Sequence, residues 1–149
     1  MKRTHPKYKS RRQRHALKKT KTQKYRPCKG PNSKEHIVEN FLEVLNDIKI
    51  YHWNTRSYSQ HKASDELYER LQTNIDKFVE VLLGKREDRL EKLGHNLHLS
   101  SKKSIKHTVY EFRNYLIQMD KCLSDTDLLN IRDEILADIN QFLYLLTLK

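Results

Sequence analysis

Residues that interrupt regular structure are rare in this chain of 149 amino acids. It contains three Gly and three Pro, and Pro6, Pro27 and Pro31 all fall within the first 31 residues. Gly and Pro are the strongest local breakers of helices and strands. The chain after Pro31 is therefore predicted to be mostly helical.

Long apolar runs and cysteines are also scarce. The longest apolar run, 142–146, has five residues, whereas a membrane-spanning helix needs roughly 20. No apolar segment follows the charged N-terminus, so a secretory signal peptide is not expected. The two cysteines, Cys28 and Cys122, have no motif spacing around them, which fits a reducing compartment. These absences predict a soluble, intracellular protein with no membrane partner.

Acidic residues are missing from the first 34 positions, a segment that we call the arm. The arm holds 14 Lys and Arg, whereas residues 35–149 hold 16 basic and 19 acidic residues. The formal charge of +11 therefore comes entirely from the arm. A segment that repels itself and buries little is predicted to be disordered. The chain thus divides into the arm, 1–34, and one folded domain, 35–149.

The arm has the composition of a nucleic-acid-binding segment. Lys and Arg neutralise phosphates and release counter-ions, which gives affinity for DNA without sequence preference. Three other interpretations stay open: a nuclear import signal, a segment that docks on an acidic protein of a larger assembly, and a solubilising tail. The side chains expected to contact DNA are Lys2, Arg3, Lys7, Lys9, Arg11, Arg12, Arg14, Lys18, Lys19, Lys21, Lys24 and Arg26.

Beyond the arm, apolar residues recur every three or four positions in four segments, which predicts four amphipathic helices. The expected core positions are Ile37, Phe41, Leu45, Ile48, Leu67, Leu71, Ile75, Phe78, Leu82, Ile105, Val109, Phe112, Leu116, Met119, Leu123, Leu128, Ile131, Ile135, Ile139, Phe142 and Leu146. Ser33 or Asn32, Ser57 or Ser59, and Ser124 or Asp125 are the expected N-caps.

The connection 85–103 is long enough to run the length of a bundle. Gly84 is expected to end the second helix, and 89–93 to form a short helix that ends at Gly94. The predicted fold is all-α: a four-helix bundle with one long crossover carrying a short helix, which is the ferritin-like topology.

Two histidines and three carboxylates stand in helical register between Tyr51 and Glu80. Residues four apart share a helix face, so His61 aligns with Asp65, and Asp76 with Glu80. His52 lies on the apolar side of the preceding helix. Imidazole and carboxylate together suit Fe(II), Mn(II) or Zn(II) rather than Ca(II) or Mg(II). The same pattern is also typical of a solvated helix face with a hydrogen-bonded core histidine.

This spacing resembles the ferroxidase motif of Dps, the mini-ferritin DNA-binding proteins from starved cells. The likeness covers residues 34–149, and the last helix resembles the closing segment of that family. Eight residues separate the two histidines, fewer than in the bacterial proteins. The residues that carry the resemblance are His52, Trp53, Asn54, His61, Asp65, Asp76 and Glu80.

The resemblance implies an iron-oxidising enzyme that also binds DNA through a Lys-rich N-terminal extension. In Dps the site lies between two subunits, so His52 and His61 would come from one chain, and Asp65, Asp76 and Glu80 from its neighbour. Hydrogen peroxide or oxygen is the oxidant, and Trp53 lies near the site. Iron is thus the expected metal, with zinc and manganese as alternatives. The expected assembly is a homo-oligomer, a dimer at minimum and a dodecamer in a Dps-like shell.

A second interpretation uses the same bundle without catalysis. The chain would then be a structural or nucleoprotein component, for example of a virion or a DNA-packaging assembly, whose arm docks on DNA or on an acidic partner. A basic arm before a Lys-rich, Gly-poor domain also resembles uncharacterised proteins of large DNA viruses. The expected locations are therefore the nucleoid, the nucleus or a virion.

Removal of the arm should abolish DNA binding, because it changes the net charge from +11 to −3 and turns attraction to phosphate into repulsion. With about half of the arm's charges engaged, the full-length chain should show a slope of log affinity against log salt of roughly −6, for DNA of any sequence. Fluorescence anisotropy across a salt series measures this slope. DNA binding by the fragment 35–149, or an affinity that salt hardly changes, would show that the binding surface lies elsewhere.

Overall fold

The computed structural model describes residues 33–93 and 104–148. Every Lys and Arg predicted to contact DNA therefore lies outside the described residues, and DNA contact by the arm stays a prediction. The described residues form α1 (Lys34–Asn54), α2 (Tyr58–Arg86), α3 (Ile105–Gln118), the short 3-10 helix η1 (Met119–Lys121) and α4 (Thr126–Leu145), with no strand among them. The prediction of an all-α domain with four helices is confirmed. No helix in this part of the chain is long and apolar enough to cross a membrane.

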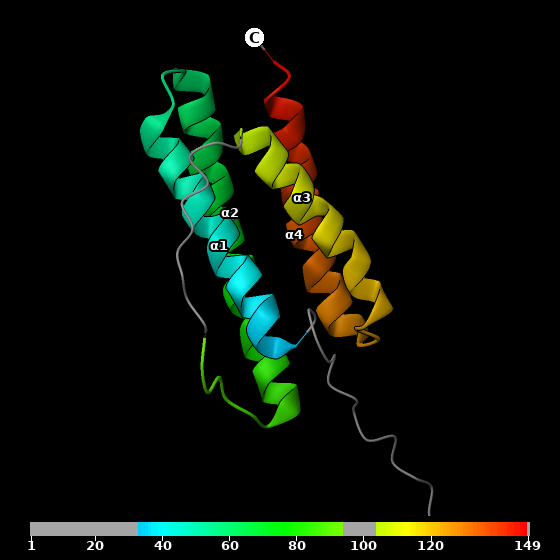
Figure 1. Cartoon of the computed structure of the whole chain (residues 1–149). Helices are drawn as coiled ribbons and strands as arrows, with labels where there is room; N and C mark the ends of the chain where they lie inside the picture. The colour runs from blue at the N-terminus through cyan, green and yellow to red at the C-terminus, as the bar shows by residue number, and fades with distance from the viewer. Residues whose placement is uncertain (1–32, 94–103, 149) are drawn as a thin grey trace, which may run out of the picture.

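The four helices form two antiparallel hairpins, α1 with α2 and α3 with α4 (Figure 1). α1 packs mainly against α2 and α3, and α4 packs against the same two helices. In Figure 1, α1 and α4 run upward, whereas α2 and α3 run downward. The connection between α2 and α3 therefore leads from one end of the bundle to the other.

Serine hydroxyls begin three of the four helices. Ser33, Ser57 and Ser104 each accept a hydrogen bond from the backbone N–H three residues later, which satisfies one of the free donors of a first helical turn. The N-caps expected at Ser33 and Ser57 are confirmed. Asp125 precedes α4 as expected, but its carboxylate lies 2.7 Å from Lys85 Nζ and makes no capping hydrogen bond.

The end of α2 and the short helix after it differ from the prediction. α2 continues through Gly84 and ends at Arg86, followed by Glu87 in the left-handed conformation with φ 50°. A Cβ at Gly84 would meet nothing within 4 Å, and two good helix formers follow it, so the helix has no reason to end there. Residues 88–93 are not helical, because Asp88 turns its carboxylate to the next backbone N–H at 2.7 Å. Residues 94–103 lie outside the described part.

The interior of the bundle is apolar. Of the expected core positions only Leu45, Ile105 and Leu146 are partly buried, and these three still pack against the core. The buried polar residues in the described part are His52, Ser64 and Arg132. Each fully buried Leu, Ile or Phe stabilises the fold by roughly 1.5–3 kcal/mol, so burial of these four stripes is the main source of stability.

The buried guanidinium of Arg132 links α4 to the end of α3. Arg132 Nη1 donates to the Leu116 carbonyl at 2.8 Å, and its Nε lies 2.8 Å from the neighbouring Asp133 carboxylate. Leu116 belongs to the last turn of α3, where its carbonyl also accepts from the Met119 N–H and where the negative end of the helix dipole attracts positive charge. The second hairpin is therefore fixed by a charged hydrogen bond as well as by apolar packing.

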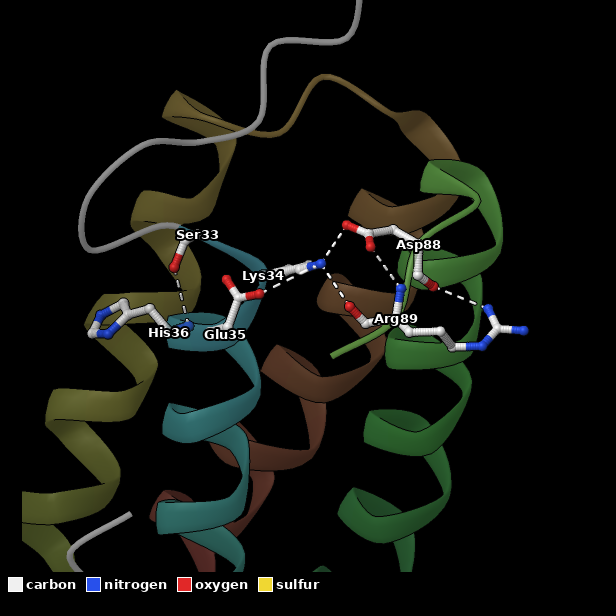
Figure 2. Close-up of polar contacts among 6 residues, drawn as sticks. All are labelled: Ser33, Lys34, Glu35, His36, Asp88 and Arg89. Carbon is white, nitrogen blue, oxygen red and sulfur yellow. Dashed lines mark hydrogen bonds and ion pairs between the residues drawn. The ribbon is translucent and has the colours of Figure 1, made fainter. Parts of the chain in front are cut away.

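An ionic contact closes the end of the bundle where the arm is attached (Figure 2). Lys34, the first residue of α1, contacts the Asp88 carboxylate, donates to the Arg89 carbonyl at 2.7 Å and lies 3.5 Å from Glu35. The hydrogen bond from Lys34 lowers the pKa of Asp88, and the same hydrogen bond raises the pKa of Lys34. This contact joins the start of α1 to the chain that leaves α2.

The Asp88 contact should stabilise the domain in a pH-dependent way. The pKa of Asp88 is lower in the folded than in the unfolded chain, so its contribution is present above the unfolded pKa and is lost as the pH falls below about 4. We expect Asp88→Asn to flatten the acid side of a plot of the unfolding midpoint against pH. Lys34→Met should have a smaller effect of the same sign, because the Arg89 N–H still donates to Asp88, and the double variant should have no larger effect than Asp88→Asn. An unchanged acid side in Asp88→Asn would contradict this assignment.

Candidate metal site at the α1–α2 hairpin

The described interior of the bundle offers no carboxylate for a metal ion. Di-iron proteins with the ferritin-like topology hold their metals with Glu and His side chains that project inward from the helices. Here the buried polar side chains are His52, Ser64 and Arg132, and the other buried side chains in the described part are apolar. A metal site built from this domain must therefore lie at its surface.

The turn between α1 and α2 brings the two predicted histidines into contact; we call His52 and His61 the histidine pair. Their rings are stacked, with centroids 3.9 Å apart and an angle of 24° between the planes. Nδ1 of His52 lies 3.1 Å from the His61 carbonyl oxygen, and Nδ1 of His61 lies 2.9 Å from the His52 carbonyl oxygen. The short turn therefore holds the two histidines together.

These reciprocal contacts assign a hydrogen to Nδ1 of both rings. A carbonyl oxygen only accepts a hydrogen bond, so each Nδ1 must carry a hydrogen and donate it. In a neutral imidazole the other nitrogen, Nε2, then bears the free lone pair. Metal-ligating histidines commonly have such a hydrogen bond from the nitrogen that does not bind the metal. The histidine pair thus has the tautomer that a metal site with two Nε2 ligands requires.

Asp65 lies next to the histidine pair. Its Oδ1 is 3.7 Å from His52 Nε2 and 3.4 Å from Lys49 Nζ. Two ligand atoms that bind one metal ion, each at about 2.1 Å, lie roughly 3–3.5 Å from one another. The nitrogen and the oxygen are therefore spaced almost as two ligands of one ion, which is a partial ligand set for a divalent transition metal.

The position of Asp65 corrects the ligand arrangement that the resemblance implied. That arrangement grouped Asp65 with the carboxylates of a neighbouring chain, whereas the structure places it beside His52 of its own chain. The reason is helical spacing: Asp65 follows His61 by one turn of α2 and so shares the face of α2 that carries the histidine.

Asp76 and Glu80 do not reach the histidine pair of their own chain. Both side chains are exposed on α2, and they follow Asp65 by about 16 and 22 Å along the helix axis. Among the residues that the structure describes, no three His, Cys, Asp or Glu side chains of one chain are grouped so that they could hold a metal ion. The five predicted ligands are therefore brought together only in part.

A groove between α1 and α2 includes Asp76 and is separated from the histidine pair by about two turns of α1 and three turns of α2. Its volume is about 510 Å³. Asp65, Asp76 and Val79 lie within about 40° of one line on α2, so the carboxylates and the groove share one face. The residues that line this α1–α2 groove are Val38, Phe41, Leu42, Leu45, Gln72, Thr73, Ile75, Asp76 and Val79.

The structure places two further side chains, Trp53 and Lys49, near the histidine pair. Trp53 follows His52, but 69% of its surface is exposed in a single chain, so its packing beside the site stays a prediction for an assembly. The sequence pattern does not predict a role for Lys49 at this site. Its ammonium group reaches Asp65 and lies 4.6 Å from the centre of the Tyr68 ring. Lys49 precedes His52 by three residues on the same helix, and this spacing is the feature of the sequence that places the two side chains on one face.

The fold and the site together define an all-helical domain with paired histidines in its first hairpin. The model of a family of unknown function, DUF5856, matches residues 52–146, which is 95 of the 149 residues, and the chain belongs to this family. The matched region starts at His52 and includes all the other candidate ligands. The comparisons with curated proteins and with solved structures each gave no match.

Substitutions of His52 can distinguish the role of Nδ1, which donates to the His61 carbonyl, from the role of Nε2. The Asn amide places an N–H donor close to the position of Nδ1, whereas Gln extends toward the position of Nε2. We expect His52→Asn to keep nearly the wild-type stability, and His52→Ala and His52→Gln to lower the free energy of unfolding by about 1 kcal/mol. Urea denaturation measures the difference. If Asn destabilises as much as Ala, the hydrogen bond to His61 is not what holds the hairpin.

Proposed function

We propose that this protein is a Dps-like ferritin, which binds and oxidises Fe(II) at a site that two copies of the chain complete. The supporting observation is the histidine pair, whose backbone hydrogen bonds leave both Nε2 atoms for a metal, with Asp65 Oδ1 3.7 Å from one of them. Imidazole and carboxylate ligands suit Fe(II). Two helical hairpins joined by an end-to-end connection also agree with a ferritin-like topology (Figure 1).

A second copy supplies the missing carboxylates in this proposal. A two-fold axis through the α1–α2 face, near the middle of α2, would set the two α2 helices antiparallel. Asp76 and Glu80 of each chain would then approach the histidine pair of the other. The α1–α2 groove lies around Asp76 on this face, so the same contact would cover its apolar side chains and the exposed indole of Trp53.

The reaction needs an oxidant that takes electrons from the substrate iron. Two ferrous ions each lose one electron, and hydrogen peroxide accepts both electrons together with two protons and becomes two waters. Oxygen is the alternative oxidant. The carboxylates favour the ferric product because a harder cation prefers oxygen ligands, while the imidazoles hold the ion and leave a position open. Trp53 would pack the site and intercept radicals.

The arm adds non-specific DNA binding to the proposed function. It joins the bundle at Lys34, whereas the histidine pair lies at the other end of α1 (Figure 1). A helix of 21 residues is about 32 Å long. The arm is therefore attached at the end of the domain away from the histidine pair.

A non-catalytic role is the second candidate, as a structural or nucleoprotein component of a larger assembly. The observation that favours it is the way the histidine pair connects α1 to α2 through backbone hydrogen bonds, which stabilise the hairpin without any metal. In this role the arm would dock on DNA or on an acidic partner. The two candidates differ in whether the chain oxidises iron.

Anaerobic Fe(II) loading followed by hydrogen peroxide tests the iron chemistry. The wild type should show saturable oxidation, measured by absorbance, above the rate in buffer. His52→Asn and Asp76→Asn should each slow it at least about tenfold, since loss of a metal ligand or its partner has effects of that size. Asp120→Asn, an exposed site outside the α1–α2 face, is the matched control. If the wild-type protein oxidised iron no faster than buffer alone, the ferroxidase proposal would be wrong and the non-catalytic role would be favoured.

Mixing two inactive variants tests whether the site is shared. A dimer of one His52→Asn chain and one Asp76→Asn chain keeps one intact site, because the unchanged histidine and the unchanged carboxylate lie on opposite chains. Co-refolding equal amounts should therefore restore about a quarter of the wild-type activity. Activity that stays absent in the mixture, with the wild type active, would place the site within one chain.

A further inference from the structure

Lys49 is the one cation that the described residues bring to the candidate ligands. It lies on α1 before His52, and its Nζ is 3.4 Å from Asp65 Oδ1. The same carboxylate oxygen is 3.7 Å from His52 Nε2, so the ammonium group and the imidazole converge on one atom. Nζ also lies 4.6 Å from the centre of the Tyr68 ring. The side chains of Lys49 and Asp65 are 29% and 37% exposed, so both can move.

The position of Lys49 conflicts with a metal ion held by His52 and Asp65. An ion that binds both Nε2 and Oδ1 would sit a few ångströms from the ammonium group, and like charges at that distance repel strongly. The lysine must therefore leave Asp65 when the ion arrives. The ammonium group already lies over the Tyr68 ring, and this contact can be kept when Asp65 is given up, because aromatic faces attract cations.

We propose that Lys49 is a built-in counter-ion: it neutralises Asp65 in the metal-free protein, gives Asp65 up when a divalent cation binds, and thereby sets the metal affinity. This inference rests on the proposed function, since it concerns the same site. Lys49 acts through Asp65 and is a positioning residue rather than a ligand. Without it, Asp65 would have no described cation near it before metal binding.

The first test measures metal affinity rather than iron oxidation. Titration calorimetry of the full chain with Co(II), a redox-stable substitute for Fe(II), gives the binding constant, and the part lost in His52→Asn defines the site. Lys49→Met keeps a stem of similar length without the charge and should bind Co(II) about two- to fivefold more tightly, the range expected for a partly exposed ion pair. Lys49→Arg keeps the charge and should bind no more tightly than the wild type.

The second test needs no metal. In the metal-free protein, the unfolding midpoints of Lys49→Met, Asp65→Asn and the double variant form a cycle that measures the coupling of the two side chains. We expect a positive coupling that disappears when saturating Co(II) is added. A purely structural lysine would keep the same coupling with and without Co(II).

The possible results separate this inference from the proposed function. If Co(II) binds in a His52-dependent way but Lys49→Met binds no more tightly, Lys49 is not the counter-ion and the iron site still stands. An absence of coupling in the metal-free protein also overturns the inference. If no variant shows His52-dependent binding, the proposed iron function fails and the inference fails with it.

Discussion

Burial of four apolar stripes is the constraint on which the rest of this structure depends. A domain of this size has one interior, and here it is filled by Leu, Ile, Val, Phe and Met, with three buried polar residues in the described part. A charged carboxylate in such an interior would need a partner and hydrogen bonds to offset its desolvation. The polar chemistry is therefore confined to the helix ends and outer faces, where a second chain can take part in it.

The reciprocal histidine hydrogen bonds then fix how α1 lies against α2. His52 belongs to the last turn of α1, where carbonyls lack helical partners, and His61 supplies a donor to its carbonyl at 2.9 Å. The buried Ser64 hydroxyl donates to the His61 carbonyl at 2.9 Å, so that carbonyl is also satisfied. This register decides which side of α2 faces α1, and hence where Asp65 and the α1–α2 groove lie.

The features that depend on local sequence could be predicted from the sequence alone. Helical period gave the four helices and nearly every buried residue, and serine chemistry gave the caps at Ser33 and Ser57. The sequence was insufficient where tertiary contacts decide: α2 passes Gly84, and 89–93 are not helical because Asp88 is engaged elsewhere. The grouping of Asp65 with His52 and Lys49 depends on the register between two helices, which no single-helix pattern contains. The proposed metal binding and DNA binding would depend on a second copy and on the arm, neither of which a single-helix pattern describes.

The stacked, doubly hydrogen-bonded histidines have a kinetic and entropic consequence. Each ring is held in place by a hydrogen bond from Nδ1 to a backbone carbonyl, so the metal binding that we propose would not require either ring to be ordered again. Immobilising a side chain costs about 0.5–1.5 kcal/mol of affinity, and preorganisation removes this cost for both imidazoles. In the proposed shared site, the slow part of loading would be the arrival of the ion and of the second chain's carboxylates, rather than a rearrangement of the hairpin.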